Sequence, residues 1–310
     1  MTCGTLGACQ APTTPARGAR TALAGSQLAP EAQHVRLWFG GDVHVGAGRA
    51  APLLTHALPL LARARGVINL EGPIASQPTR QRADRRWLLF NAPSVAAQLA
   101  RAGVAVATLA NNHAGDDGPS GRARTRSVLA AADLRTADDA QPARLAGAIV
   151  AAVDLSRGLP ADLAASLQRA RGSRDSALFA VAFHVAHPPS YLPSPRLARA
   201  VDIAIAAGAR VVVAHGTHEL ARIERRGDAV IAWGLGNLVF ACRCSRAREG
   251  LLLYVARRGK HLAAAVAPID VGREPGQPAR PSRDAAGVFE LLRALESSPF
   301  DVKGGVAWIR

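Results

Sequence analysis

The sequence predicts a mixed α and β fold in which buried strands alternate with helices. Short apolar runs recur along the chain, amphipathic segments separate them, and polar residues of metal-binding types follow several runs directly. Open α/β sheets usually bind ligands at the carboxyl ends of their strands. With 310 residues, of which 49% are hydrophobic, the chain is long enough to bury a sizeable core.

The net charge of +15 is carried almost entirely by arginine, since Lys260 and Lys303 are the only lysines. Together with the alanine content, this makes composition bias the first explanation of the charge. The functional alternative is attraction to polyanions such as nucleic acid, anionic lipid or an acidic polymer. No arginine-rich helix with interleaved aromatic residues is present, which argues against nucleic-acid binding.

We expect a disordered segment or tether over residues 1–33, a folded domain over residues 34–300 and a C-terminal tail over residues 301–310. The segment Leu6-Gly7-Ala8-Cys9 resembles a lipoprotein cleavage site, although no basic or apolar leader region precedes it. A cell-envelope location, as a lipoprotein or secreted protein, follows if the start is truncated, and a cytoplasmic one otherwise. Cys242 and Cys244 are too close for an ordinary bridge, so we expect free thiols.

The first half of the chain contains three predicted strands. Apolar and β-branched residues place them at residues 35–39, 66–70 and 104–109. Glycines 40 and 41 are expected to turn the chain after the first strand. Helical spacing of leucine and alanine predicts helices over residues 50–65, from Ser94 to residue 101, and over residues 122–132.

The second half continues the alternation. Apolar runs predict strands at residues 147–155, 177–183, 209–214 and 229–233, followed by an antiparallel pair at 251–257 and 261–269. Helices are predicted over residues 162–171, 195–207 and 285–296. For the second of these, Ser194 is the expected N-cap, Pro195 the first helical residue and Gly208 the stop signal.

Residues of metal-ligand type follow five of the predicted strands. Carboxylate, imidazole and amide oxygen together form a ligand set for two divalent ions such as manganese, iron or zinc. Each motif alone also fits an ordinary polar turn, but the recurrence at five strand ends favours a shared site. The residues are Asp42 and His44, Glu71, Asn112 and His113, His184 and His187, and His215 and His218.

Two neighbouring cations suit hydrolysis of a phosphate ester, because they can activate water and neutralise phosphoryl oxygens. Glu71 is the natural bridging ligand, since it is a lone acid between the other strand ends. His113 is the candidate proton donor to the leaving group. Asp116 is expected to orient His113 or to stabilise the turn.

The ordered set of motifs resembles the bacterial CapA-type capsule-synthesis proteins, also called poly-γ-glutamate biosynthesis proteins, of the calcineurin-like metallophosphatase superfamily. The resemblance covers residues 35–300. It rests on Gly41-Asp42, Asn69-Leu70-Glu71-Gly72-Pro73, Ala110-Asn111-Asn112-His113 with Asp116 and Gly118, His215-Gly216-Thr217-His218, and Gly234-Leu235-Gly236-Asn237-Leu238-Val239-Phe240. It implies an α+β fold, a four-layer αββα sandwich of the metallo-dependent phosphatase type. It further implies metal roles for Asp42, Glu71, Asn112, His184, His215 and His218.

Two departures from the family pattern affect the site. The family usually carries His-Trp-Gly-x-Glu after the fifth strand, whereas His184 is followed here by Val185-Ala186-His187. Position 44 is usually apolar, and His44 restores the Asp-x-His of ordinary calcineurin-like phosphoesterases. We therefore assign Asp42, His44 and His218 to one ion. His184, His215 and Asn112 are assigned to the other ion, and Glu71 to the bridge.

The leading hypothesis is a CapA-like metal-dependent hydrolase linked to capsule or poly-γ-glutamate biosynthesis. Its substrate would be a phosphoester or an anionic envelope polymer. The alternative is a non-catalytic accessory subunit of a membrane-bound polymer synthase, which the altered segment after His184 favours and His44 opposes. A third hypothesis is a plain α/β domain whose histidines are structural.

Overall fold

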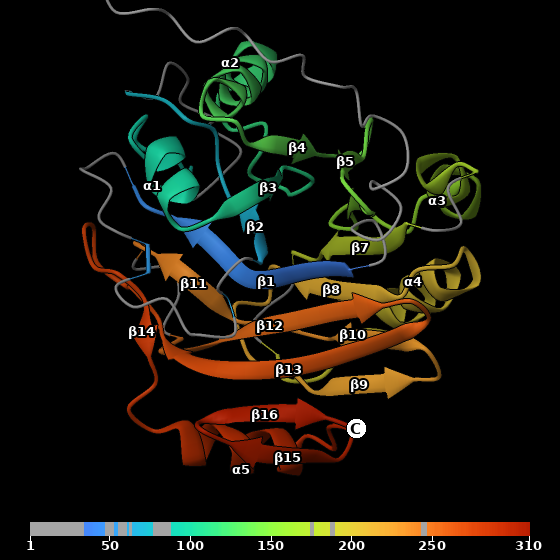
Figure 1. Ribbon diagram of the computed structural model, residues 1–310. Helices are drawn as coiled ribbons and strands as arrows, with labels where there is room; N and C mark the ends of the chain where they lie inside the picture. Colours follow the sequence, from blue (N-terminus) through green and yellow to red (C-terminus); the bar gives the residue numbers. More distant parts are fainter. Residues whose placement is uncertain are drawn as a thin grey trace, which may run out of the picture.

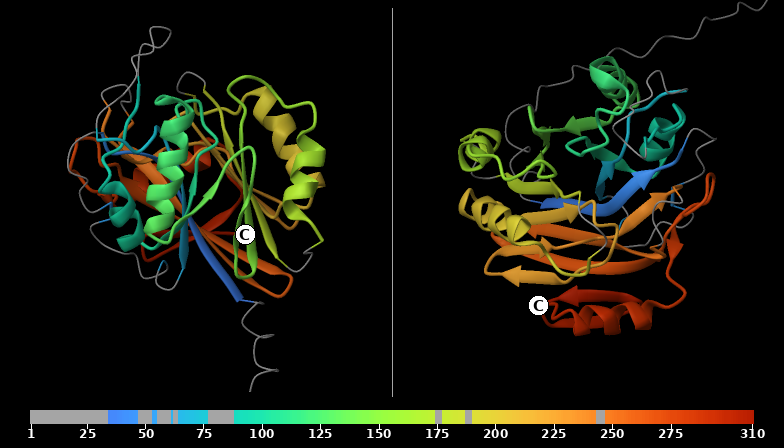
Figure 2. Two further views of the ribbon diagram at one scale, coloured as in Figure 1. Left: turned by 90° about the horizontal axis from the view of Figure 1, so that it is seen from above. Right: turned by 180° about the vertical axis from the view of Figure 1, so that it is seen from behind.

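The chain folds as an α+β sandwich in which two β-sheets face each other and helices cover both outer faces (Figures 1 and 2). This computed structural model describes residues 34–46, 53–54, 61, 64–76, 88–173, 177–186, 190–242 and 247–310. The α+β sandwich predicted from the sequence is confirmed. No helix in the described part of the chain is long and apolar enough to cross a membrane.

The larger sheet has ten strands, eight of them in the order β15-β16-β13-β12-β1-β2-β3-β4. Strands β1 to β4 run parallel, and β12 pairs antiparallel with β1. Two further strands join this order, β11 beside β1 and β14 beside β13. The bounds are β1 His34–His44, β2 Arg65–Leu70, β3 Val104–Thr108, β4 Arg135–Ala137, β11 Asn237–Phe240, β12 Glu249–Arg258, β13 His261–Asp270, β14 Arg280–Pro281, β15 Phe300–Lys303 and β16 Val306–Ile309.

The smaller sheet has six strands in the order β5-β6-β7-β8-β10-β9. Its central strands β6, β7, β8 and β10 are parallel, and buried apolar residues dominate them. The bounds are β5 Ala143–Leu145, β6 Ala148–Asp154, β7 Leu178–His184, β8 Val211–His215, β9 Ile223–Arg226 and β10 Ala229–Ala232.

Three hydrophobic clusters separate the layers. One lies between the sheets and includes Phe39, Val150 and Val213. The second joins the larger sheet to α1 (Val95–Arg101) and α2 (Gly118–Ala131), and the third joins the smaller sheet to α3 (Leu163–Arg171) and α4 (Pro195–Ala206). A fifth helix, α5 (Ala285–Ala294), packs near β13 and β16 and contributes to the cluster between the sheets. Apolar faces on both sides of each sheet thus require four layers.

The start of α4 follows the sequence signal closely. The Ser194 hydroxyl accepts a hydrogen bond from the Leu197 backbone N–H at 3.2 Å, and Pro195 occupies the first helical position. The cap satisfies a backbone N–H that has no partner inside the helix.

The helix predicted over residues 50–65 is wrong at Leu54 and Arg65, whereas Leu61 lies in a 3₁₀ turn. Leu54 forms an isolated parallel bridge with Ala279, and Arg65 is the first residue of β2. The other positions of that segment lie mostly outside the described residues. Leu53 is buried in the cluster on the outer side of the larger sheet, and the bridge of Leu54 to Ala279 replaces the local helical preference at this position.

The turn predicted at glycines 40 and 41 is also wrong, because β1 continues through both residues to His44. Its pairing with β2 is irregular between Phe39 and Asp42. A Cβ atom on Gly41 would lie 2.1 Å from the Gly236 carbonyl oxygen. Gly41 therefore allows two backbones to approach closely rather than making a turn.

Two further segments differ from expectation. Residues 301–310, expected as a tail, contribute β15 and β16, which extend the larger sheet beyond β13. Cys242 is disulfide-bonded, so the free thiol predicted at this position is wrong. The remaining cysteines lie outside the described residues.

Candidate metal centre

The carboxyl ends of the parallel strands of both sheets meet at one end of the sandwich. Within the smaller sheet, His184 at the end of β7 lies in register with His215 of β8 and with Asp154 of β6. The Gly216 backbone N–H donates to Asp42 Oδ2 at 3.1 Å, which joins the end of β8 to β1 of the other sheet. Side chains from both sheets therefore share one space.

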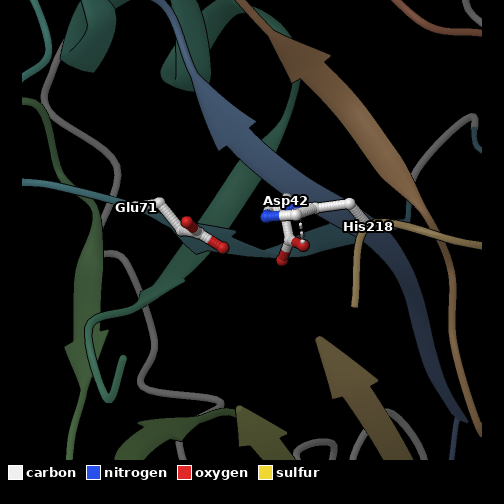
Figure 3. Close-up of side chains that lie close together, drawn as sticks. All are labelled: Asp42, Glu71 and His218. Carbon is white, nitrogen blue, oxygen red and sulfur yellow. Dashed lines mark ion pairs between the residues drawn. The ribbon is translucent and has the colours of Figure 1, made fainter. Parts of the chain in front are cut away.

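Asp42, Glu71 and His218 form the compact centre of this space. One donor atom from each residue lies within 4.8 Å of the others. Asp42 and Glu71 are buried, and His218 is partly buried. Figure 3 shows the Glu71 carboxylate pointing toward Asp42, with the ion pair between Asp42 and His218 drawn as a dashed line.

Asp42 is surrounded by nitrogen atoms. Nδ1 of His218 lies 3.0 Å from Asp42 Oδ2, and Nδ1 of His215 lies 3.3 Å from Asp42 Oδ1. The Asn69 amide donates to Oδ1 at 2.8 Å. Burial alone raises the pKa of Asp42, but His215 and His218 lower it, and the net pKa lies well below its usual range. Asp42 is thus held as a carboxylate.

Glu71 and His218 show the opposite effect of crowded buried charge. Burial, followed by the negative charge of Asp42, raises the pKa of Glu71 to about 8. Burial lowers the pKa of His218, but Glu71 and Asp42 more than offset it and raise that pKa to about 9. Without a cation, Glu71 is therefore protonated and His218 is positively charged at neutral pH. A divalent cation would replace these protons.

His184 and Asn112 extend the centre toward the smaller sheet. His184 Nε2 lies 2.7 Å from Asn112 Oδ1, and its Nδ1 lies 3.9 Å from Glu71 Oε1. Burial, as the largest cause, lowers the pKa of His184 to about 4. The imidazole is therefore neutral at physiological pH, which is the form that binds metals.

The donor set fits a transition-metal ion. Nδ1 of His44 is buried and has no hydrogen-bond partner, and the buried Nδ1 of His215 has only its ion-pair contact with Asp42. Buried imidazole nitrogens normally have a partner, so such atoms beside a carboxylate pair are consistent with ligation. The predicted ligands Asp42, Glu71, His184, His215 and His218, with Asn112, are all brought together.

His44 is the predicted ligand that stands apart. Like His184 and His215, it lies outside the compact group of Asp42, Glu71 and His218, but unlike them it forms no hydrogen bond or ion pair with another described ligand. Its ring packs against Phe240 with centroids 5.5 Å apart. Burial, followed by the charge of His113, lowers the pKa of His44 to about 4. His44 thus lines the same end of the molecule between the metal centre and His113. The other variable position, His187, lies outside the described residues.

His113 and Asp116 form a dyad next to the metal centre. Nδ1 of His113 lies 2.7 Å from Asp116 Oδ2, and this oxygen also accepts the Leu89 backbone N–H at 2.9 Å. Asp116 is fully buried and His113 is partly exposed. The carboxylate therefore has both relationships expected from the sequence, orienting the imidazole and stabilising the surrounding chain.

Asn69 is a central residue that the sequence analysis did not include among the site residues. Its amide contacts Asp42, lies 3.5 Å from Glu71 Oε1 and lies 3.3 Å from His184 Nδ1. Its carbonyl oxygen accepts from Thr108 and from Asn111. An asparagine inside the apolar run of β2 was the available signal, because a buried amide requires several polar neighbours.

Asn237 and Asp154 complete the surroundings. Asn237 lies in register with Asp42, and its Oδ1 is 2.9 Å from His218 Nδ1. Asp154 ends β6 beside His184, and its charge acts on both Glu71 and His184. Asp154 was visible in the sequence as a further acid at a strand end.

A cavity of about 500 Å³ opens beside the metal centre. Asn111 and Asn112 form the wall nearest the centre, and the other lining residues are Gly115, Arg122, Asp139, Asp154, Ser156, Arg157 and Ala186. Arg122 and Arg157 form no hydrogen bond or ion pair with another described residue. On the same helix as Arg122, Arg124 pairs with Asp117 and Arg126 pairs with Asp138. The cavity therefore offers two guanidinium groups to a bound molecule.

The sequence comparisons agree with these motifs. The family described as "Bacterial capsule synthesis protein PGA_cap" matches residues 36–138 and 137–242, which include all the candidate metal ligands. A search of curated proteins found no match. The matched region covers most of the described sandwich and more than half of the chain. The chain therefore belongs to the bacterial capsule synthesis protein family PGA_cap.

Proposed function

We propose that this capsule-synthesis family member is a metal-dependent hydrolase that acts on a phosphoester or on an anionic envelope polymer. The observation that carries the proposal is the compact, buried group of Asp42, Glu71 and His218 at the strand ends. Two buried carboxylates in such proximity are costly unless a cation offsets them. Buried carboxylates with strongly shifted pKa values beside a cavity are typical of functional sites.

Two divalent ions, manganese, iron or zinc, would occupy the centre. Asp42 and His218 would hold one, while His184, His215 and Asn112 would hold the other, and Glu71 would bridge. When bound, such ions supply Lewis acidity and a more acidic water molecule. The residues Asn69 and Asn237 orient Asp42 and His218 through their amide groups. His44 packs against Phe240 and would line the centre beside the first ion.

His113 is the proposed proton donor to the leaving group. It is partly exposed, so a substrate can reach it, and Asp116 determines which face its other nitrogen presents. A hydrogen bond from the His113 backbone N–H to Asn111 Oδ1 positions the same turn that carries Asn112. The proton donor and the proposed metal ligand are therefore placed by one short turn.

The cavity beside Asn112 supports an anionic substrate. Arg122 and Arg157 line it, and guanidinium groups bind carboxylates and phosphates in bidentate geometry. Asp139 and Asp154 also line the cavity and limit its net positive charge.

A cell-envelope location is part of the proposal. The disulfide at Cys242 suits an oxidising compartment, and disulfides are rare in the bacterial cytoplasm. Capsule synthesis takes place at the envelope, which makes a membrane-bound polymer synthase the natural partner. The lipoprotein-like segment ending at Cys9 supports the same location.

Elemental analysis of the purified chain tests the metal part of the proposal. We expect manganese, iron or zinc in the wild type at about two ions per chain, and loss of metal in Glu71→Ala. Glu290→Ala, which removes an exposed carboxylate on α5, is the matched control and should retain metal. Absence of metal from the wild type after exposure to manganese and zinc would contradict the proposal.

A second candidate function is that of a non-catalytic accessory subunit. The segment after His184 favours it, because Val185 is buried in the apolar layer and Ala186 offers no ligand. A screen of aryl phosphates, phosphodiesters and anionic polymers with metal-loaded protein separates the two functions. Turnover that disappears in His113→Ala supports the hydrolase, whereas bound metal without any turnover supports the accessory subunit.

A further inference from the structure

The end of the sandwich opposite the metal centre carries a cluster of cationic side chains. We call Arg36, Arg210, Arg257, Arg258 and Lys260 the basic end. Four of them belong to the β1 and β12 pair or to the turn between β12 and β13, and Arg210 directly precedes β8 of the other sheet. Residues from widely separated parts of the chain therefore form one surface.

The register of the larger sheet places these cations together. His34, the first residue of β1, lies opposite Arg258, and Arg36 lies opposite Ala256. Arg258 in turn lies opposite His261 across the next pair of strands. Residues that face each other across paired strands lie on the same side of a sheet, so His34, Arg36, Arg258 and His261 share its outer face. All four are exposed.

The second sheet supplies the rest of the cluster. Arg210 donates from Nη2 to the Lys260 carbonyl oxygen at 3.1 Å and from Nε to the Asp228 carbonyl oxygen at 2.7 Å. These bonds hold the Arg210 guanidinium against the turn that carries Lys260. Partial burial, followed by the positive charge of Arg210, lowers the pKa of Arg257. The two guanidinium groups thus lie close enough to repel each other.

Little negative charge balances the basic end. Arg210 pairs with the Asp228 carboxylate at 3.7 Å. Arg36, Arg258 and Lys260 form no ion pair with any residue that the structure describes. Some exposed arginines elsewhere in the chain do have acidic neighbours, as Arg283 has Asp270 and Arg310 has Asp301.

The position of the basic end along β1 relates it to both the N-terminal segment and the metal centre. Residues 1–33 join the sandwich at His34, within this surface. Asp42 follows eight residues later on the same strand, which corresponds to about 26 Å at the usual rise of a strand. A surface bound at the basic end would therefore leave the metal centre facing away from it.

We propose that the basic end binds the surface of an anionic phospholipid membrane and orients the metal centre away from that membrane. Exposed arginines and lysines on one face are attracted to acidic headgroups within about one Debye length, roughly 8–10 Å. The cations lie at the ends of strands from both sheets, which suits contact with an extended anionic surface. Residues 1–33 join the sandwich at this same end, so the N-terminal segment and the proposed membrane contact lie on the same side of the molecule.

Vesicle sedimentation tests the proposal with the full 310-residue chain. The probes are vesicles of phosphatidylcholine alone and vesicles that also contain phosphatidylglycerol. We expect binding to the second kind only, weakening as salt is raised, because exposed charges are screened by salt. The variant Arg36→Glu/Arg258→Glu/Lys260→Glu should bind at least about tenfold more weakly.

The matched control is Arg199→Glu/Arg248→Glu/Arg280→Glu, which changes net charge equally at exposed positions outside the basic end. It should retain binding within about twofold. Equal loss in both variants would show attraction to total charge and would overturn the proposal. Binding to a soluble polyanion such as polyglutamate, without binding to acidic vesicles, would overturn it as well. Circular dichroism of both variants excludes misfolding as the cause.

Discussion

The two ends of the same parallel strands hold charge in different ways. At the carboxyl ends, Asp42 and Glu71 are buried and in contact with imidazoles. At the opposite end, where β1 begins and β12 ends, Arg36, Arg258 and Lys260 are exposed to solvent. Water stabilises the second group at little cost, whereas the first group depends on its protein neighbours and on any bound cation.

The difference is visible in the protonation of the groups. Burial and like charge raise the pKa of Glu71 to about 8, and burial lowers that of His184 to about 4. At the basic end the pKa of Arg257 is lowered, but an arginine remains charged throughout the physiological range. Charge state at the metal centre therefore responds to pH and to metal, while the basic end keeps its charge. The comparison suggests chemistry at one end and attachment at the other.

The largest expected effect is on catalysis. His113→Ala should lower kcat on whichever substrate the screen identifies by roughly a hundred- to ten-thousand-fold, because the proton donor is lost. Metal content should remain that of the wild type, because His113 is paired with Asp116 and is not one of the proposed metal ligands. His261→Ala, at the basic end, is the control and should keep full activity. Full activity in His113→Ala would rule out its proposed role.

The next largest effect concerns acid stability of the metal-free protein. The folded-state pKa of His44 is about 4, whereas the unfolded value is 6.5. Below pH 6.5, His44 binds a proton in the unfolded state but stays neutral in the folded state. The free energy of unfolding therefore falls as pH decreases toward 4. His44→Leu should remove about 3 kcal/mol of this loss.

Urea unfolding in the presence of a chelator, at both limits of that pH window, measures the difference. The exposed His261→Leu is the matched control and should lose stability as the wild type does. Identical pH dependence of His44→Leu and wild type would show that His44 is not buried in its neutral form.

A smaller effect distinguishes two glycines of the two ends. Gly216 has φ +93°, and a Cβ there would lie 2.4 Å from the Val185 carbonyl oxygen and 2.8 Å from His184 Nε2. Gly259, in the turn at the basic end, has φ +60° and open space around it. Gly259→Ala should cost about 1–2 kcal/mol from its backbone conformation alone. Gly216→Ala should cost about 2 kcal/mol more and weaken metal binding.

Thermal unfolding and elemental analysis of the two alanine variants provide the test. Equal destabilisation, with metal retained in both, would indicate that the contact between Gly216 and His184 does not position a ligand.

The smallest expected effect is independence of the two ends. The Arg36→Glu/Arg258→Glu/Lys260→Glu variant should keep its metal content and its kcat on a soluble substrate within about twofold, because about 26 Å of strand exceeds the Debye length. Elemental analysis and the activity screen apply directly. A large loss of metal would show that the ends are coupled through the sheets.

Some elements were predictable because local sequence and final environment agree. The apolar runs of β6, β7 and β8 are buried on both faces, as parallel strands usually are. The short strands β4, β5 and β9 were not predicted, because three or four residues of mixed polarity carry too weak a local signal. They exist because neighbouring strands offer them hydrogen bonds.

The candidate site shows the same division. Asp42, Glu71, His184 and His215 were identifiable because ligand-type residues end apolar strands. Asn69 was not, because within β2 it looked like one polar residue in an apolar run. Its role follows from contacts with residues as distant in the chain as His184.

The sequence by itself determined the α+β class, most long strands and helices, and the residue types at the strand ends, because these depend on local periodicity and local chemistry. Only the tertiary structure decided that β1 continues through Gly41, that His44 stands apart from the compact metal group, and that Arg210 reaches Lys260. These outcomes depend on the register and packing of strands far apart in the chain. No local pattern encodes such contacts, since each requires the backbone of a distant segment to be in place.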